Sequence, residues 1–296
     1  MRKLERKKAW LNDIPVAKYE QPIHSPILEI QNVSFGYPDK QATLNNVNLT
    51  IHRGEMVSIV GANGTGKSTL GKLICGFEKP ISGTLLFNGK NGNNDSLKMR
   101  GEQVGFVLQN PNQMFSKHIV QEEVGLGLLH KEVSPDEVKL RVEQTLKVCG
   151  LYPFRNWPIS ALSYGQKKRL SIAAILVMEP SILLLDEPTA GQDYKHTTEL
   201  MTFLESLQTQ GITIILITHD MHLMTEYTKR AIVLSGGQII ADDSPAKILA
   251  NTELIERANL KQSSLHALAT TLHITDHERF VEKFIQFDRE VRLNEQ

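Results

Sequence analysis

Residues 61–69 read GANGTGKST, and this glycine-rich segment limits the possible folds more than any other part of the chain. It satisfies the pattern G-x-x-x-x-G-K-[ST]. The apolar run MVSIV precedes it, and Leu70, Leu73, Ile74 and Phe77 follow it at helical spacing. A strand, a loop of inward-pointing backbone N–H groups and a helix are therefore expected, which is an arrangement that binds phosphate groups.

This phosphate loop (residues 61–69) predicts individual nucleotide ligands. Lys67 is expected to reach the β and γ phosphates, Ser68 to coordinate magnesium through its hydroxyl, and Thr69 to donate to the α phosphate. A glycine-rich turn that matches by chance is the alternative, and the flanking strand and helix argue against it. The residues expected to contact the nucleotide here are Gly61, Asn63, Gly64, Gly66, Lys67, Ser68 and Thr69.

Two adjacent carboxylates, Asp186 and Glu187, directly follow the apolar run ILLL at 182–185. Carboxylates at the carboxyl end of a buried strand lie at the same edge of the sheet as a phosphate loop. Asp186 is expected to hold magnesium, through water, and Glu187 to act as the general base that polarises the attacking water. On their own the pair could equally be solvated, and the phosphate loop upstream favours the catalytic interpretation.

The order of the expected elements indicates an α/β fold with an inserted helical lobe. The segments ILEIQNVSFGY and LNNVNLTIHRGE alternate apolar and polar residues, which predicts an antiparallel sheet. The segments SILLLDE and ITIILITHD are apolar enough to be buried strands of a mainly parallel sheet. Ser134, Pro135 and Glu137 form the pattern of a capping box and begin a helix, a second helix should follow Gln166, and residues 89–101 look like a surface loop.

Three regions are expected along the chain. Residues 1–26 are polar, basic and interrupted by prolines, as in a tail or linker. Residues 27–243 should form the nucleotide-binding domain, with the helical lobe at about 110–165. Residues 244–296 show helical patterns and would serve equally well as a packed cap or as a dimerisation region.

The composition excludes some classes of protein. Lys and Arg total 33 and Asp and Glu total 33, so the chain lacks the basic excess typical of nucleic-acid binders. No apolar run reaches the roughly 18 residues that span a bilayer, and the basic start has no apolar segment behind it, so a soluble chain without an export signal is expected. Cys75 and Cys149 are expected to be small core residues in a reducing compartment, and the basic run at 167–169 a solvated helix face.

Further motifs resemble those of one family. Residues 162–166 read LSYGQ, which looks like the ABC signature LSGGQ with Tyr164 at its third position. EPTAGQD resembles the ABC dimerisation loop and ends at Asp193. His219 matches the switch histidine, Gln109 the glutamine loop, and Tyr37 the aromatic residue that stacks on adenine. The chain from about residue 27 to 240 therefore resembles the ATP-binding subunits of ABC transporters.

This resemblance implies a P-loop ABC ATPase fold, with a mainly parallel core, an antiparallel β subdomain, a helical subdomain and a C-terminal helical extension. It implies a head-to-tail dimer with a second ABC domain, in which Ser163 and the Gly165 amide, supported by Gln166, act on the ATP of the partner. Catalysis would use Glu187, His219 and Gln109, and the cofactors would be ATP and Mg²⁺. The magnesium ligands it implies are Ser68, Gln109 and Asp186.

The same resemblance implies an integral membrane partner and a peripheral position at the cytoplasmic face of the membrane. Three segments, QNPNQMF, LYPFRNWPISALSYGQKKRLSIAAIL and EPTAGQD, together look like those of the ATPases of energy-coupling-factor (ECF) vitamin importers. In particular, they resemble the second ATPase half of the hydroxymethylpyrimidine or thiamine type. The second domain could be an identical chain, a different chain or a fused half.

Other functions fit the sequence less well. Importers of cobalt, nickel or another vitamin are the first alternative. Soluble ABC proteins that act on ribosomes or DNA need a second domain with a charged linker or a long coiled coil, and a GTPase needs an N-K-x-D segment, none of which the sequence provides.

Overall fold

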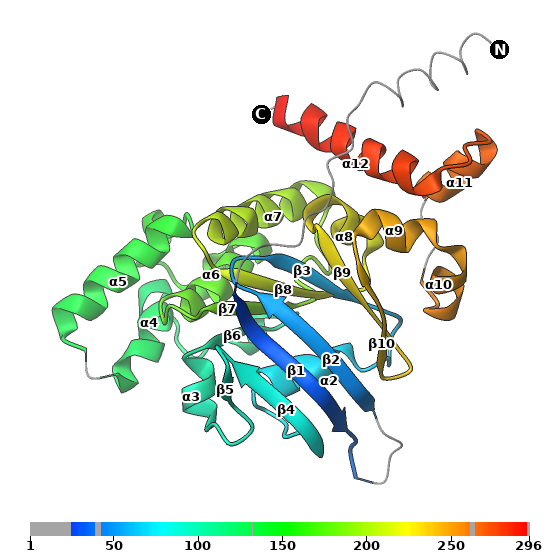
Figure 1. Cartoon of the computed structure of the whole chain (residues 1–296). Coiled ribbons are helices and arrows are strands. Elements are labelled where there is room, and N and C mark those ends of the chain that lie inside the picture. Colours follow the sequence, from blue (N-terminus) through cyan, green and yellow to red (C-terminus); the bar gives the residue numbers. More distant parts are fainter. Residues whose placement is uncertain (1–24, 39–42, 132, 261–263, 295–296) are drawn as a thin grey trace.

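The computed structural model describes residues 25–38, 43–131, 133–260 and 264–294, and contains two sheets (Figure 1). One has four strands in the order β2-β1-β4-β5, and the other has six in the order β10-β9-β3-β8-β7-β6. The expected α/β fold is confirmed. The strands are β1 (Pro26–Phe35), β2 (Leu44–His52), β3 (Met56–Val60), β4 (Ser82–Phe87), β5 (Lys90–Asn91), β6 (Val104–Val107), β7 (Ile182–Asp186), β8 (Thr213–Thr218), β9 (Arg230–Ser235) and β10 (Gln238–Asp243).

Helices cover the six-stranded sheet and form the inserted lobe and the C-terminal region (Figure 1). The lobe contains α4 and α5, and α12 lies across α9 near the C-terminal end. The helices are α2 (Lys67–Ile74), α3 (Leu97–Gly101), α4 (Val120–Gly125), α5 (Pro135–Val148), α6 (Tyr164–Leu176), α7 (Tyr194–Thr209), α8 (Met221–Tyr227), α9 (Pro245–Ala250), α10 (Thr252–Arg257), α11 (Ser264–Thr271) and α12 (His277–Asn294).

The six-stranded sheet is buried on both faces. β3, β6, β7, β8 and β9 run parallel, and β10 pairs antiparallel with β9. Alternate residues of β7 enter different cores: Leu183 and Leu185 pack with residues of α6 and α7, whereas Ile182 and Leu184 pack with α2 and the antiparallel sheet. Double burial explains why β7 and β8 are apolar runs without alternation.

The parallel register aligns the strand ends that carry the expected site. Val60, the last residue of β3, pairs with Thr218 of β8, and Asp186 of β7 pairs with Ile217. The phosphate loop, the two carboxylates and the segment after β8 therefore leave the sheet at one edge.

The antiparallel sheet is confirmed, and it is larger than expected. β1 pairs with β2 and also with β4, which the sequence patterns did not reveal. The loop expected at residues 89–101 is wrong, because it contains β5 and α3. Arg100 holds this segment: it is 3% exposed, donates to the Ile74 carbonyl at 2.8 Å and lies 3.9 Å from the centre of the Phe87 ring.

The helix starts follow local capping chemistry. Ser134 accepts a hydrogen bond from the Glu137 amide at the start of α5, but the Glu137 carboxylate binds Arg141 at 2.7 Å, so the expected capping box is only half formed. α6 begins at Tyr164 and not after Gln166 as expected, because Ser163 caps it. Cys75 and Cys149 are buried as expected, and burial raises the pKa of each thiol to about 12.

The C-terminal extension is helical as expected and packs on the core. α9 and α12 contact each other and α8, and Phe280 and Val281 are buried in a cluster that includes Val60 and Met224. A role in dimerisation stays a prediction.

The tail is expected at residues 1–26. Residues 1–24 lie outside the described part of the chain, and Pro26 already belongs to β1. Among the residues described, no helix has the length and apolar character needed to cross a bilayer.

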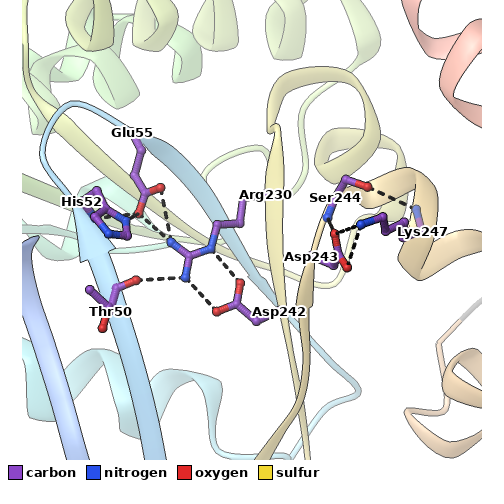
Figure 2. A network of polar contacts seen from close by, with 8 residues as sticks. All are labelled: Thr50, His52, Glu55, Arg230, Asp242, Asp243, Ser244 and Lys247. Carbon is purple, nitrogen blue, oxygen red and sulfur yellow. Dashed lines mark hydrogen bonds and ion pairs between the residues drawn. The ribbon is translucent and has the colours of Figure 1, made fainter. Parts of the chain in front are cut away.

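A buried arginine joins the two sheets away from the phosphate loop (Figure 2). Arg230, at the start of β9, donates to Glu55 at 3.0 Å, to Asp242 of β10 at 2.6 Å and to the Thr50 carbonyl of β2 at 2.9 Å. Arg230 and Glu55 are 7% and 8% exposed, so the buried Glu55 charge depends on Arg230 for compensation. Figure 2 also shows a second pair, Asp243 and Lys247, and both of these side chains are exposed by 40% or more.

Replacing this arginine should destabilise the fold. Arg230→Met leaves the buried Glu55 charge without its partner, so we predict a loss of about 3 kcal/mol in the free energy of unfolding. Urea denaturation measures it. The matched control is Lys247→Met, which removes a solvent-exposed pair and should cost less than about 1 kcal/mol. Equal losses in the two variants would contradict the role given to Arg230.

Candidate functional site

The phosphate loop folds tightly around the Lys67 side chain. Lys67 Nζ donates to the Gly61 carbonyl at 2.7 Å and to the Ala62 carbonyl at 2.9 Å, and the residue is 7% exposed. Burial lowers the pKa of Lys67, and the negative charges of Glu187 and Asp186 oppose that effect. The loop, the lysine and both carboxylates therefore lie close together, and their roles in nucleotide binding stay predictions.

Two glycines make this loop possible. A Cβ atom at Gly61 would lie 2.2 Å from the Leu234 carbonyl oxygen, so no other residue fits where the loop leaves β3. Gly66 has a φ of +104° and precedes the first residue of α2, where a Cβ would also lie 2.8 Å from Leu44 Cδ2. Asn63 and Gly64, by contrast, are exposed at the tip of the loop, and their contacts with nucleotide stay predictions.

Ser68 and Asp186 meet, as expected for a magnesium site. The Ser68 hydroxyl lies beside the Asp186 carboxylate and acts to lower its pKa. Burial has the larger effect and raises the pKa of Asp186, while the charges of Lys67 and Lys168 oppose this rise. A hydroxyl and a carboxylate that converge on one point are oxygen ligands of the kind that Mg²⁺ prefers, so these residues fit the ion.

Glu187 and His219 also lie together. His219 Nδ1 is 2.6 Å from Glu187 Oε1, the His219 backbone N–H donates to the same oxygen at 3.1 Å, and the Thr218 hydroxyl donates to Oε2 at 3.3 Å. Glu187 has a φ of +45°, which is uncommon for a residue with a side chain and is frequent at functional sites. Its carboxylate is therefore held in one position at the mouth of the phosphate loop. Thr218 is a contact that the sequence patterns did not suggest.

Gln109 lies two residues beyond β6 and is exposed. It contacts Lys168 through its backbone: the Gln109 carbonyl accepts a hydrogen bond from Lys168, which also donates to the Leu108 carbonyl at 3.4 Å. The expectation that residues 167–169 form a solvated face is wrong for Lys168, which is 1% exposed. Burial lowers the pKa of Lys168 to about 8, and the charge of Asp186 opposes the shift. The roles expected for the Gln109 side chain stay predictions.

Tyr37 lies just after β1 and is half-buried. Its ring packs edge-to-face on Phe35, with 5.0 Å between the ring centres. This contact fixes the ring near the strand end, and stacking on adenine stays a prediction.

The signature segment forms a complete capping box at the start of α6. The Ser163 hydroxyl accepts from the Gln166 backbone N–H at 3.3 Å, and the Gln166 side chain accepts from the Ser163 backbone N–H at 2.9 Å. The spacing S-x-x-Q explains why the helix starts here. Tyr164 is 41% exposed, and Ser163 is exposed, so the positive end of the helix faces outward.

The expected dimerisation loop ends in a second helix cap. Asp193 accepts from the His196 backbone N–H at 2.9 Å and contacts His196 Nδ1 at 2.8 Å. The hydrogen bond from the His196 backbone is the largest of the effects that lower the pKa of Asp193. A cavity of about 260 Å³ lies between this helix and the signature, and Ser163, Gly165 and His196 are among its lining residues.

Comparison with known proteins identifies the family. Residues 44–190 match the ABC transporter family. The structure superposes on that of cbiO1 from Clostridium perfringens, described as part of the ABC transporter complex cbiONQ, with a TM-score of 0.74 and 36% identity over 84% of this chain and 99% of that one. The chain belongs to the ABC transporter ATP-binding family. The site described above therefore lies in a member of this family.

Two other relatives define how far the likeness extends. A dimeric ATP-binding cassette in a post-hydrolysis state, bound to ADP and Pi, matches with a TM-score of 0.64 and 31% identity over 74% of this chain and 98% of that one. A Clostridium perfringens protein named "Putative ABC transporter ATP-binding protein" is 54% identical over 97% of this chain and 50% of its own length. The chain thus spans about half the length of the curated relatives it matches.

Removing the phosphate-loop lysine should weaken nucleotide binding. Lys67→Ala deletes the cation that is packed against the loop carbonyls, so we predict that ATP affinity falls by at least about tenfold, as for a lost charge-assisted hydrogen bond. Isothermal calorimetry with ATP measures the change. Lys79→Ala, an exposed lysine beyond α2, is the control and should bind ATP normally. Unchanged ATP affinity in Lys67→Ala, with the protein folded by circular dichroism, would refute the assignment.

Proposed function

We propose that this chain hydrolyses ATP as one half of a two-domain motor and passes the movement to an integral membrane partner. One observation carries the proposal: the signature helix α6 presents Ser163 outward, while the phosphate loop, Glu187 and His219 assemble at the edge of the core sheet. Each chain then supplies a phosphate loop for one ATP and a signature for another. A second ABC domain completes both sites.

Hydrolysis in this proposal uses groups that are already positioned. Glu187 accepts a proton from the attacking water, and the His219 and Thr218 contacts hold its carboxylate in place. Lys67 holds the β and γ phosphates. Magnesium, bound by Ser68 and Asp186 with Gln109, would neutralise the charge that develops on the phosphates. Hydrolysis removes the γ phosphate on which the partner signature acts.

ATP binding drives closure of the dimer because ATP has a higher affinity for the closed state than for the open state. The closed dimer brings Ser163 and the Gly165 amide of one domain onto the γ phosphate held by the other, and the open dimer lacks these contacts. ATP therefore favours closure by the free energy of the signature contacts. The loss of those contacts after hydrolysis permits reopening.

An apolar groove offers a docking site for the membrane partner. It has a volume of about 490 Å³ and is lined by residues of α3, β6 and α6 and by the segments after α2 and β6. Phe77 and Leu97 are 55% and 58% exposed at its rim, and such apolar surface is typical of protein interfaces. Leu108 and Gln113 also line it, so it lies beside Gln109, where a helix of the partner would sense the ATP site.

Import of a vitamin or its precursor, in an ECF-type complex, is the finer proposal. The likeness to cbiO1, which belongs to the cbiONQ complex, supports the ECF class, and cobalt or nickel import is the second candidate. The half-length match supports a second ATPase half in the same polypeptide, and a separate chain would serve the same role. The equal totals of acidic and basic residues favour protein partners over nucleic acid, and the motor would lie at the cytoplasmic face of the membrane.

Glu187→Gln should separate binding from hydrolysis. The variant keeps the shape of the side chain but loses the base, so turnover should fall by about 10² to 10⁴ while ATP still binds and closed dimers accumulate. Phosphate release and size-exclusion chromatography with ATP measure the two effects. Glu256→Gln, an exposed residue of α10, is the control. Normal turnover in Glu187→Gln would exclude Glu187 as the base.

A groove variant tests the membrane partner directly. Phe77→Asp combined with Leu97→Asp places two charges on the apolar rim, so an integral membrane protein that co-purifies with the wild-type chain should be lost, while ATP binding persists. The matched control is Leu129→Asp, which alters a side chain that is 65% exposed outside the groove. Mass spectrometry of affinity-purified complexes identifies the partner. Equal recovery with the groove and control variants would overturn the docking site, and absence of any membrane protein with the wild type would overturn the transport proposal.

A further inference from the structure

The segment at residues 108–117, here called the glutamine loop, is held at both ends by buried charges from two different helices. At its start, Lys168 of α6 donates to the Leu108 and Gln109 carbonyls. At its end, Glu123 of α4 accepts from the backbone N–H groups of Ser116 and Lys117, at 2.8 Å and 2.6 Å. Lys168 is 1% exposed and Glu123 is 4% exposed.

A buried lysine is costly, so its position requires a reason. Burying a cation is unfavourable unless polar groups replace the lost water. Here two backbone carbonyls and the negative charge of Asp186 do so. Packing alone could be achieved by an apolar side chain of similar length at lower cost. The neighbours on the same helix differ: Lys167 is half-exposed, and Arg169 pairs with Glu199 at 3.9 Å.

The location of Lys168 links three functional elements. It lies on the helix that Ser163 caps, five residues beyond Ser163, which is about 7.5 Å along a rigid helix axis. Its amine reaches the carbonyl of Gln109, and it lies within the electrostatic reach of Asp186 at the end of β7. The same loop supplies Leu108, Gln113 and Met114 to the apolar groove.

We propose that Lys168 is a positioning residue that couples the signature helix to the glutamine loop. By holding the loop backbone from α6, it makes the position of Gln109 depend on the position of Ser163. This inference rests on the proposed function for its consequence in the dimer. The contact itself lies within one chain, so its test does not depend on a membrane partner.

Hydrogen–deuterium exchange of the nucleotide-free full chain tests the anchor. Lys168→Met keeps the length of the side chain and removes its charge and donors, so amide exchange within residues 108–117 should rise by about fivefold or more, as for local opening. Peptides from residues 61–76 and from α12 should keep their wild-type rates. Lys168→Gln, which is shorter and neutral, should give the same selective increase and serves if Lys168→Met fails to fold. Lys167→Met is the matched control and should exchange as the wild type does.

ATPase kinetics test the consequence for Gln109. Lys168→Met should lower kcat by about tenfold and raise the Mg²⁺ concentration for half-maximal activity, as supporting contacts of metal ligands do, while the KM for ATP stays within about twofold. Lys168→Arg, which keeps the charge and the donors, should recover most of the activity. A uniform rise in exchange over the whole chain would overturn the proposal, as would an unchanged glutamine loop or an equal effect of Lys167→Met.

Discussion

The alignment of three strand ends is the constraint on which the rest of the molecule depends. β3, β7 and β8 run parallel and in register, so the phosphate loop, Asp186 and His219 all leave the sheet at one edge. A shift of one residue in β7 would turn its apolar residues from one core to the other. Leu183 and Leu184 are completely buried in different cores, so that shift is excluded. Packing of the apolar residues of β7 therefore fixes the position of Asp186 at the end of the strand.

Opposite charges in this site compensate one another for the loss of water. Three charged groups, Lys67, Lys168 and Asp186, are largely removed from solvent. Burial lowers the pKa of the two lysines and raises that of the aspartate, which in each case favours the neutral form. Each of these shifts is opposed by a neighbour of the opposite charge. The site is therefore a network in which removal of one charge alters the protonation of the others, and single substitutions here should not be additive.

The parts of the site that could be predicted from sequence are those whose chemistry is local. GANGTGKST and the carboxylates after an apolar run each encode their own backbone geometry. The S-x-x-Q pattern that starts α6 is also local, but the start expected after Gln166 is too late. The short helix at 97–101 has no room for periodicity and is held by Arg100, which reaches Ile74 across 26 positions. Burial of Lys168 depends on carbonyls 59 and 60 residues away, so no pattern within residues 167–169 could indicate it. Long-range contacts thus account for the failures.

Under the proposed function, the glutamine loop gives a mechanical reason why one chain can be both an enzyme and half of a motor. Its first residues lie against Lys168 of the signature helix, its last residues lie against Glu123 of α4, and its middle lines the apolar groove. If α6 moves toward the ATP of a partner, the loop must move with it. Otherwise the contacts made by these buried charges would break, and an unpaired buried charge is unfavourable. Under the proposed function, signature, magnesium ligand and groove must move together, so ATP contact at one surface changes the shape of another.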